Sequence, residues 1–319
     1  MADRFDRLDE LIDAVLSRPE SAPAADPELA PLARLAADLR DLPSPEFKQR
    51  LSEDLKRRAS MSTTAVSPVR EGFRTVTPYL VVHQGAELID FLKQAFGAEE
   101  THRSPVPGGF HAEVRIGDSM LMIGSAPASR PPQLAALHCY VENPDEVYRR
   151  ALQLGAASLQ EPLEDHGERV AAVRDPSGNE WYIARSLGAS YRQEGMNDLN
   201  LYLHPEGSAK LLDFLQRAFA AETIARYDSA EGAVLHAKVR VGTSVVEIGE
   251  AHGPWEPLPT MVMLYVPDTD ALYHQALAAG ATSLHEPVDV PYGRSAAVTD
   301  PAGNIWYTCT PPELRDTPV

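Results

Sequence analysis

An internal repeat limits the folds open to this chain more than any other feature of its sequence. The segment HAEVRIGDSMLMIGSA, which begins at His111, matches HAKVRVGTSVVEIGEA, which begins at His236. The turn sequences DPSGN and DPAGN, which begin at Asp175 and Asp300, recur at the same offset of 125 residues. The repeated stretch is about 115 residues long, which is an ordinary domain size. The sequence therefore predicts two homologous domains in tandem.

Within each repeat, the spacing of apolar residues switches between that of strands and that of helices. TVTPYLVV is typical of a strand, whereas residues 85–96 place Leu88, Phe91, Leu92 and Phe96 on one helical face. HAEVRIG and SMLMIG then alternate as two strands around a Gly-Asp turn. The same order restarts in the second half of each repeat. We therefore expect an α+β fold in which each of the two tandem domains consists of paired βαβββ units, with four units in the chain.

The repeat also sets the expected domain boundaries. Residues 1–60 carry apolar residues at helical spacing and predict an N-terminal helical extension, and residues 61–72 resemble a linker. The first repeated domain is expected at 73–187 and the second at 197–312. A short linker at 188–196 and a C-terminal tail at 313–319 complete the chain.

Composition excludes several classes of protein. The 319 residues hold 29 Lys and Arg against 46 Asp and Glu, a net charge of −17, so no basic face is expected for nucleic acid or an anionic membrane. The two cysteines, Cys139 and Cys309, cannot form a disulfide framework and favour a reducing compartment. The N-terminus lacks a signal peptide's apolar core, and no apolar run is long enough to span a membrane. We expect a cytoplasmic protein.

The paired βαβββ units, the DPxGN turn and the HAxxRIGDS and YVxxPDxxY stretches resemble the glyoxalase/bleomycin-resistance/extradiol-dioxygenase (vicinal oxygen chelate) superfamily, and its PhnB-like branch in particular. The resemblance covers residues 73–312. It implies that the strands of paired units form curled mixed sheets around a cleft. Some members are metal-dependent lyases, isomerases or dioxygenases, and others are metal-free proteins that sequester antibiotics. Duplicated units could pair within one chain or by exchange between protomers.

In the metalloenzymes of this superfamily, first and last strands of each unit supply His and Glu ligands to one divalent metal. The resemblance allows those positions to be transferred to this chain. In the first domain they fall on Thr77, Met122, Ala136 and Tyr182. In the second domain they fall on Asp198, Glu247, Met261 and Tyr307.

Only the second domain keeps carboxylates at these positions. If Asp198 and Glu247 converge in a cleft, they could hold a divalent metal or act as a catalytic acid and base. Otherwise Asp198 is a solvated residue at a strand start, and Glu247 faces water or an arginine. The first domain lacks the usual metal ligands, so no cofactor is expected there, and a metal is conceivable in the second domain alone.

Other side chains are candidates for binding a ligand. His138 points to the same side of its strand as Ala136 and could line the first cleft. Arg169 and Arg294 recur in both repeats, either as ion pairs that tie a strand to a loop or as anchors for an anionic ligand group. Tyr182 and Tyr307 are expected to line the clefts, with Met122 and Met261 beside them.

These patterns favour a metal-free small-molecule binding protein that resembles the bleomycin-resistance type. One alternative is a glyoxalase-like, metal-dependent lyase or isomerase that acts from the second domain through Asp198 and Glu247. Another is a scaffold that recruits a protein partner, or a second copy in a homodimer, through residues 1–60. The expected partner is a small molecule, with neither nucleic acid nor a membrane.

Overall fold

The computed structural model of the chain describes residues 69–70, 72–253 and 255–315. All of them belong to one compact unit, residues 67–319. The predicted extension at 1–60 and most of the linker at 61–72 lie outside the described residues.

Four βαβββ units follow one another along the chain, and a short helix ends the described part. The first unit consists of β1 (Val76–Val82), α4 (Gly85–Phe96), β2 (Glu99–Val106), β3 (Gly109–Ile116) and β4 (Ser119–Ser125). The second consists of β5 (Ala136–Tyr140), α5 (Pro144–Gln153), β6 (Ala157–Asp165), β7 (Glu168–Arg174) and β8 (Glu180–Ser186). The third consists of β9 (Leu199–Leu203), α6 (Ser208–Phe219), β10 (Glu222–Asp228), β11 (Val234–Val241) and β12 (Ser244–Gly249). The fourth consists of β13 (Met261–Tyr265), α7 (Thr269–Ala278), β14 (Thr282–Val290), β15 (Gly293–Thr299) and β16 (Ile305–Thr310), and α8 (Pro312–Arg315) follows it.

The recurring DPxGN turn has a clear physical role. The Asp175 carboxylate accepts hydrogen bonds from the backbone of Ser177 and Asn179, from the Asn179 amide and from the Trp181 indole. Gly178 adopts φ 103°, a conformation that glycine tolerates best. Asp300 makes the same set of contacts in the second repeat. The turn therefore fixes a buried tryptophan at the start of the last strand of each repeat.

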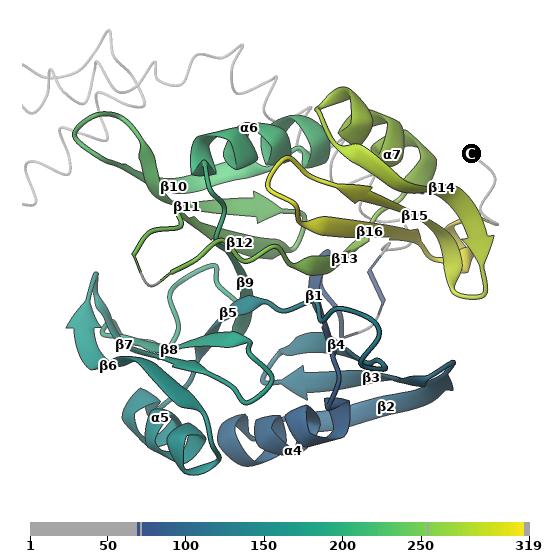
Figure 1. Ribbon diagram of the computed structural model, residues 1–319. Coiled ribbons are helices and arrows are strands. Elements are labelled where there is room, and N and C mark those ends of the chain that lie inside the picture. The colour runs from purple at the N-terminus through teal and green to yellow at the C-terminus, as the bar shows by residue number, and fades with distance from the viewer. Residues whose placement is uncertain (1–68, 71, 254, 316–319) are drawn as a thin grey trace, which may run out of the picture. The chain divides into compact units, whose positions relative to one another are not determined.

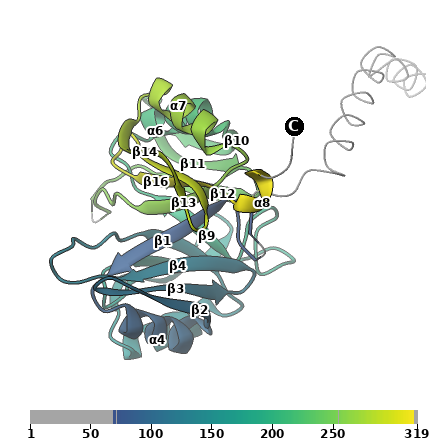
Figure 2. The ribbon, with the colours of Figure 1, turned by 90° about the vertical axis from the view of Figure 1, so that its right-hand side faces the viewer.

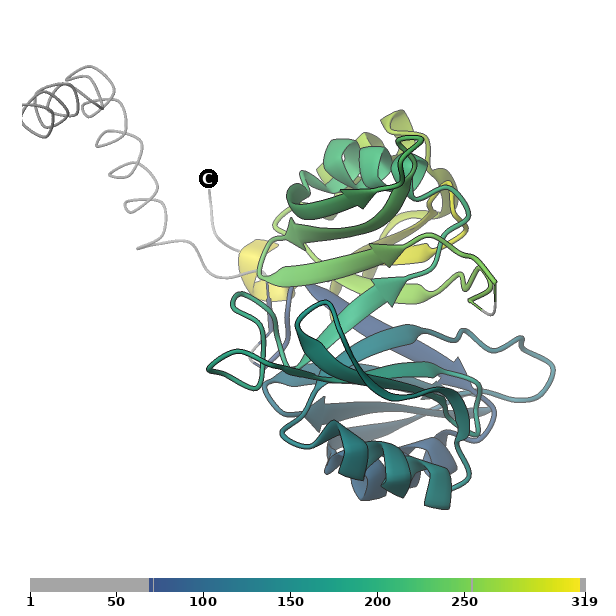
Figure 3. The same ribbon diagram turned by 90° about the vertical axis from the view of Figure 1, so that its left-hand side faces the viewer.

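The strands form two eight-stranded mixed sheets. The order is β14-β15-β16-β13-β1-β4-β3-β2 in one sheet and β10-β11-β12-β9-β5-β8-β7-β6 in the other. In the first sheet β1 pairs antiparallel with β13, and Figure 2 shows β1 between β13 and β4. In the second sheet β5 pairs antiparallel with β9, and Figure 3 shows this side of the molecule. Each sheet therefore combines one unit from each repeat.

The helices keep each repeat together as a packed body. Figure 1 shows α4 beside α5 at one end of the described unit and α6 beside α7 at the other. Phe96 packs on Trp181 with ring centroids 4.7 Å apart, and Phe219 packs on Trp306 at 4.8 Å. Each repeat thus buries its helices within itself, while its sheets continue into the other repeat.

The expected fold class is confirmed, with paired βαβββ units that form two mixed sheets. The repeat boundaries do not mark the sheet boundaries, because the first unit shares a sheet with the fourth and the second with the third. Among the helices of the described part, none is long and apolar enough to cross a membrane.

Candidate functional site

A cavity of about 620 Å³ lies over the sheet that joins the second and third units. Its lining comes from β5 to β8 of the first repeat and from β9 to β12 of the second. The segment Gln193–Met196, which links the two repeats, forms a further part of its wall. This volume is within the range of pockets that hold drug-sized ligands.

A buried charged cluster lines the cavity. Glu247 on β12 is 4% exposed in its side chain, and its Oε1 lies 2.6 Å from Nδ1 of His138 on β5. Its Oε2 lies 3.4 Å from Nε2 of His236 and 3.4 Å from Nζ of Lys238, both on β11. Lys238 also donates a hydrogen bond of 3.0 Å to Oε1 of Gln193. Groups within the chain therefore compensate the charge of Glu247.

A second carboxylate flanks His138. Oε2 of Glu168 on β7 lies 3.5 Å from Nε2 of His138, a nitrogen that is buried and makes no hydrogen bond within the described residues. The Tyr140 hydroxyl donates to the other oxygen of Glu168, and its ring stacks on His138 with centroids 4.6 Å apart. His138 is thus held between two carboxylates.

These contacts fix the charge states of the pair. Burial alone would raise the pKa of Glu247, but the charge and hydrogen bond of His138, with His236 and Lys238, hold it well below its usual range. Burial alone would lower the pKa of His138, but Glu247 and then Glu168 raise it. We infer an ionised Glu247 beside a protonated His138.

Aromatic side chains form another wall of the cavity. The Tyr182 hydroxyl lies 2.9 Å from Nε2 of His204, and the Tyr182 ring contacts Tyr202 and Trp255 at centroid distances of 4.8 and 5.2 Å. Burial, followed by the charges of His252 and His236, lowers the pKa of His204 to about 4. His204 is therefore neutral at pH 7, which leaves this wall suited to planar ligand groups.

The donor set does not fit a divalent metal. Within the described residues, no group of three or more His, Cys, Asp or Glu side chains could hold one. Ala136 and Tyr182 stand at two of the positions where the resemblance places ligands. Both oxygens of Glu247 already face cationic or hydrogen-bonding partners.

The structure regroups the residues predicted from the sequence. His138, Tyr182 and Glu247 meet in the cavity, although they come from different repeats. Four further predicted positions lie on the other sheet, where Met122 belongs to an apolar cluster with Met263 and Tyr307 packs against it. On that sheet are Thr77, Met122, Met261 and Tyr307.

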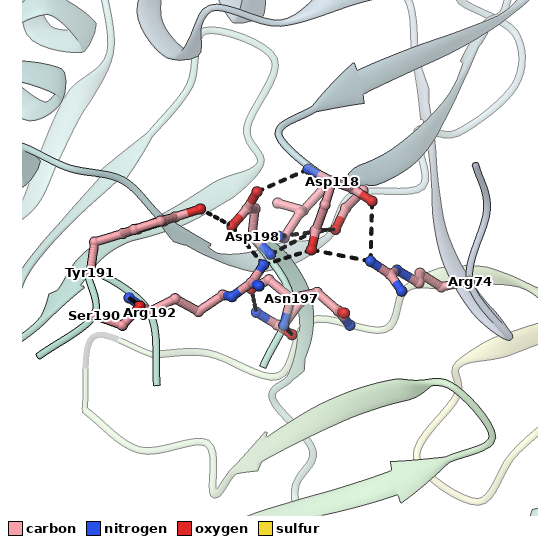
Figure 4. Close-up of polar contacts among 10 residues, drawn as sticks. Arg74, Asp118, Ser190, Tyr191, Arg192, Asn197 and Asp198 are labelled. Atoms are coloured by element: carbon pink, nitrogen blue, oxygen red, sulfur yellow. Dashed lines mark hydrogen bonds and ion pairs between the residues drawn. The ribbon is translucent and has the colours of Figure 1, made fainter. Parts of the chain in front are cut away.

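Asp198 lies apart from the cavity lining, at the start of β9 (Figure 4). Its carboxylate accepts hydrogen bonds from the backbone of Asp118 at 2.9 Å, from the Tyr191 hydroxyl at 2.6 Å and from Arg192 at 2.8 Å. The Asp118 carboxylate accepts the Asp198 backbone N–H at 3.0 Å in return. The structure therefore does not bring Asp198 together with Glu247.

The two recurring arginines both bind the first turn of a helix. Arg169 forms two hydrogen bonds with Asp145, of 2.9 and 2.6 Å, and Arg294 forms two of 2.7 Å with Asp270. Each arginine is thereby paired within the chain. Neither lines the cavity.

Several cavity residues carried no usable signal as separate positions in the sequence. Glu168 and Trp255 have no counterpart of the same type in the other repeat, where Gly293 and Arg130 stand, and Lys238 stands where the first repeat has Glu113. The available signal was this charge reversal at equivalent positions. It becomes meaningful only when the second and third units are known to share a sheet.

Comparisons with known proteins agree with this fold. The family model described as Glyoxalase/Bleomycin resistance protein/Dioxygenase superfamily matches residues 74–183 and 207–307. The uncharacterised protein Mb0911c of Mycobacterium bovis is 32% identical over 147 residues, which cover 41% of this chain and 93% of the relative. CFP32 of Mycobacterium tuberculosis, which carries a glyoxylase name, is 26% identical over 225 residues, or 65% of this chain and 84% of CFP32. The crystal structure of glyoxalase I from Zea mays aligns with a TM-score of 0.57 at 14% identity, over 73% of this chain and 92% of the maize chain.

Proposed function

Because the chain belongs to the glyoxalase/bleomycin-resistance/dioxygenase superfamily, we propose that it is a metal-free small-molecule binding protein whose ligand occupies the 620 Å³ cavity. One observation carries the proposal. The buried carboxylate of Glu247 is compensated by His138, His236 and Lys238, so the cavity needs no metal to balance its charge.

The walls support binding of a planar, partly polar compound. Tyr182, Tyr202 and Trp255 offer ring faces, and Lys238 and His236 offer polar atoms between them. Such a mixture of aromatic walls and a few placed polar groups is typical of small-molecule sites. The bleomycin-resistance type of activity and the PhnB-like branch are the finer parts of this proposal.

A thermal-shift screen of the full chain against metabolites and antibiotics tests the proposal. A ligand at about 100 times its Kd stabilises the folded state by about 2.7 kcal/mol, which raises Tm by several degrees. Tyr182→Ala should weaken the shift, whereas Tyr307→Ala, the matched change on the other sheet, should not. A screen without binders, or a shift that Tyr307→Ala reduces and Tyr182→Ala does not, would refute the proposal.

Metal content tests the metal-free part. After incubation with zinc, nickel, manganese and iron, gel-filtered wild-type protein should retain far less than one ion per chain by mass spectrometry. One tightly held ion per chain would contradict it.

A lyase or isomerase is the second candidate, favoured by the 2.6 Å contact between His138 and Glu247. A carboxylate that orients and charges a histidine is suited to proton transfer. Turnover of a glyoxalase-type substrate that Glu247→Gln abolishes without unfolding would support it. The scaffold role through residues 1–60 concerns residues outside the described part. The cytoplasmic location and the lack of nucleic-acid and membrane partners remain predictions from composition.

A further inference from the structure

Lys238 occupies an unusual place for a lysine. Its side chain is 15% exposed, it lies in the cavity wall, and its ammonium is 3.4 Å from Oε2 of Glu247. Lys238 and Glu247 are direct cross-strand partners in the pairing of β11 with β12. The pair is therefore fixed by the register of the sheet and not by a flexible surface contact.

The same oxygen of Glu247 has a second neighbour at an informative distance. Nε2 of His236 lies 3.4 Å from Oε2 of Glu247. Two ligands bound to one tetrahedral zinc-like ion at about 2.1 Å are themselves about 3.4 Å apart. His236 and Glu247 thus already have the mutual spacing of two ligands of one metal ion.

The ammonium of Lys238 prevents these two groups from acting as ligands. It lies 3.4 Å from the oxygen that the ion would bind, so a divalent ion there would be repelled by the ammonium. Gln193 holds the ammonium in this place through its 3.0 Å hydrogen bond.

The equivalent place in the first repeat supports a role for an internal cation. There Glu113 replaces Lys238 and pairs across the strands with Met122. Arg70 supplies the cation, with Nη1 2.7 Å from Oε1 of Glu113. In both sheets, a buried carboxylate in this part of the sheet is therefore neutralised by a cationic side chain of the protein, Arg70 for Glu113 and Lys238 for Glu247.

We propose that Lys238 is a built-in cation that excludes divalent metals from the cavity, because it keeps Glu247 and His236, two groups that have the mutual spacing of metal ligands, from binding an ion, while His138 orients the Glu247 carboxylate through a hydrogen bond. The inference rests on the proposed metal-free function and names the residue that enforces it.

Removing the ammonium tests the inference with metal alone. Full-length Lys238→Met, freed of metal and titrated with Zn²⁺ or Ni²⁺ by calorimetry, should bind about one ion per chain at least about tenfold more tightly than wild type. Adding Glu247→Gln should abolish the gain. Lys210→Met, which removes an exposed lysine on α6, should behave like wild type and controls for net charge.

Lys238→Gln guards against misfolding of the methionine variant, because glutamine can still bond Gln193 while carrying no charge. If the folded variants gain no metal affinity, the inference fails and the proposed function stands. If wild type itself binds one ion per chain tightly, both the inference and the metal-free function fail. Metal bound by Lys238→Met that persists after Glu247→Gln would also overturn the inference, because the site would then be elsewhere.

Discussion

Replacing Asp198 by alanine should destabilise the protein rather than remove a ligand contact. The Asp198 carboxylate accepts three hydrogen bonds, from the Asp118 backbone, Tyr191 and Arg192. A carboxylate accepts all three, and a hydrogen bond to a charged group contributes about 1.5–3 kcal/mol. Because Arg192 keeps its 2.6 Å contact with Asp118, the loss from that bond is at the low end. We expect Asp198→Ala to lower the free energy of unfolding by at least about 3 kcal/mol, which is the low-end contribution of the bonds from Asp118 and Tyr191 alone.

The other junction between the two repeats contains a matched control for this substitution. At the equivalent junction, the backbone N–H of Thr243 donates to Oγ1 of Thr75 at 3.0 Å, and that of Thr75 donates to Oγ1 of Thr243 at 3.1 Å. These are the same reciprocal bonds as those between Asp118 and Asp198, without charge or an arginine. Thr75→Ala should therefore lower the free energy of unfolding by about 1 kcal/mol.

Urea unfolding at pH 7 gives both values from the midpoint and slope. Ligand binding, measured with a compound from the thermal-shift screen, should be unchanged in folded Asp198→Ala, because Asp198 does not line the cavity. If the variant unfolds at the wild-type urea concentration but loses ligand binding, the reciprocal junction is not what Asp198 supports. The hypothesis that it converges with Glu247 would then regain its basis.

Two further perturbations address the cavity wall. The pKa of His204 is about 4 in the folded protein and 6.5 when unperturbed, so on acidification the unfolded state is protonated first. The free energy of unfolding should therefore fall by up to about 3 kcal/mol as the pH drops from about 6.5 to 4. In His204→Gln, urea midpoints measured across this range should lose that part of their pH dependence; an unaltered profile would contradict a neutral buried His204. Gly249→Ala would place a Cβ 2.5 Å from the Tyr202 hydroxyl, and it should weaken ligand affinity measured by calorimetry. Gly124→Ala would place its Cβ 3.3 Å from the nearest atom, in the Val81 side chain, and it should leave the affinity unchanged. Equal effects of the two alanines would contradict a role for Tyr202 in the cavity.

Local sequence patterns predicted the units because each unit satisfies its own backbone and buries its own helix. The spacing of Leu88, Phe91 and Leu92 predicted the helix that is observed as α4, and all three side chains are buried. The DPSGN sequence predicted a turn, and Gly178 within it has positive φ. Such features depend on neighbours in sequence, which a single chain displays directly.

The partners of each unit could not be predicted in the same way. Any of the four units presents a similar edge strand, and the choice of β13 for β1 and of β9 for β5 depends on how the two repeats pack. Transferring ligand positions domain by domain therefore grouped Glu247 with Met261 and Tyr307, which lie on the other sheet. His138 and Glu247, which are 109 residues apart in sequence, meet only because of this exchange.

The two sheets have the same strand arrangement and differ in the side chain at one position of the fourth strand of a unit, in β4 and in β12. Tyr79 and Tyr202 pair with Met122 and Glu247 respectively, so a phenol stands beside a thioether in one sheet and beside a carboxylate in the other. The segment before each first strand bonds the same position of the third strand, through Arg70 to Glu113 and through Gln193 to Lys238.

The two sheets therefore place their opposite charges differently. In one sheet the cation is Arg70 in the covering segment and the anion is Glu113 on the third strand; in the other the cation is Lys238 on the third strand and the anion is Glu247 on the fourth. Burial would raise the pKa of Glu113, but its contacts with His111 and Arg70 outweigh burial and bring the pKa to about 2, so this carboxylate is ionised and neutralised by the segment that covers it. Lys238 donates a hydrogen bond to the neutral amide of Gln193 in its covering segment, and its charge is compensated by Glu247 on the neighbouring strand β12. A polar ligand can exchange contacts with the Lys238 and Glu247 pair, but beside Met122 it would lose its hydration without a partner. Selectivity between the two sheets thus follows from one fourth-strand position, which holds the carboxylate of Glu247 in one sheet and the thioether of Met122 in the other.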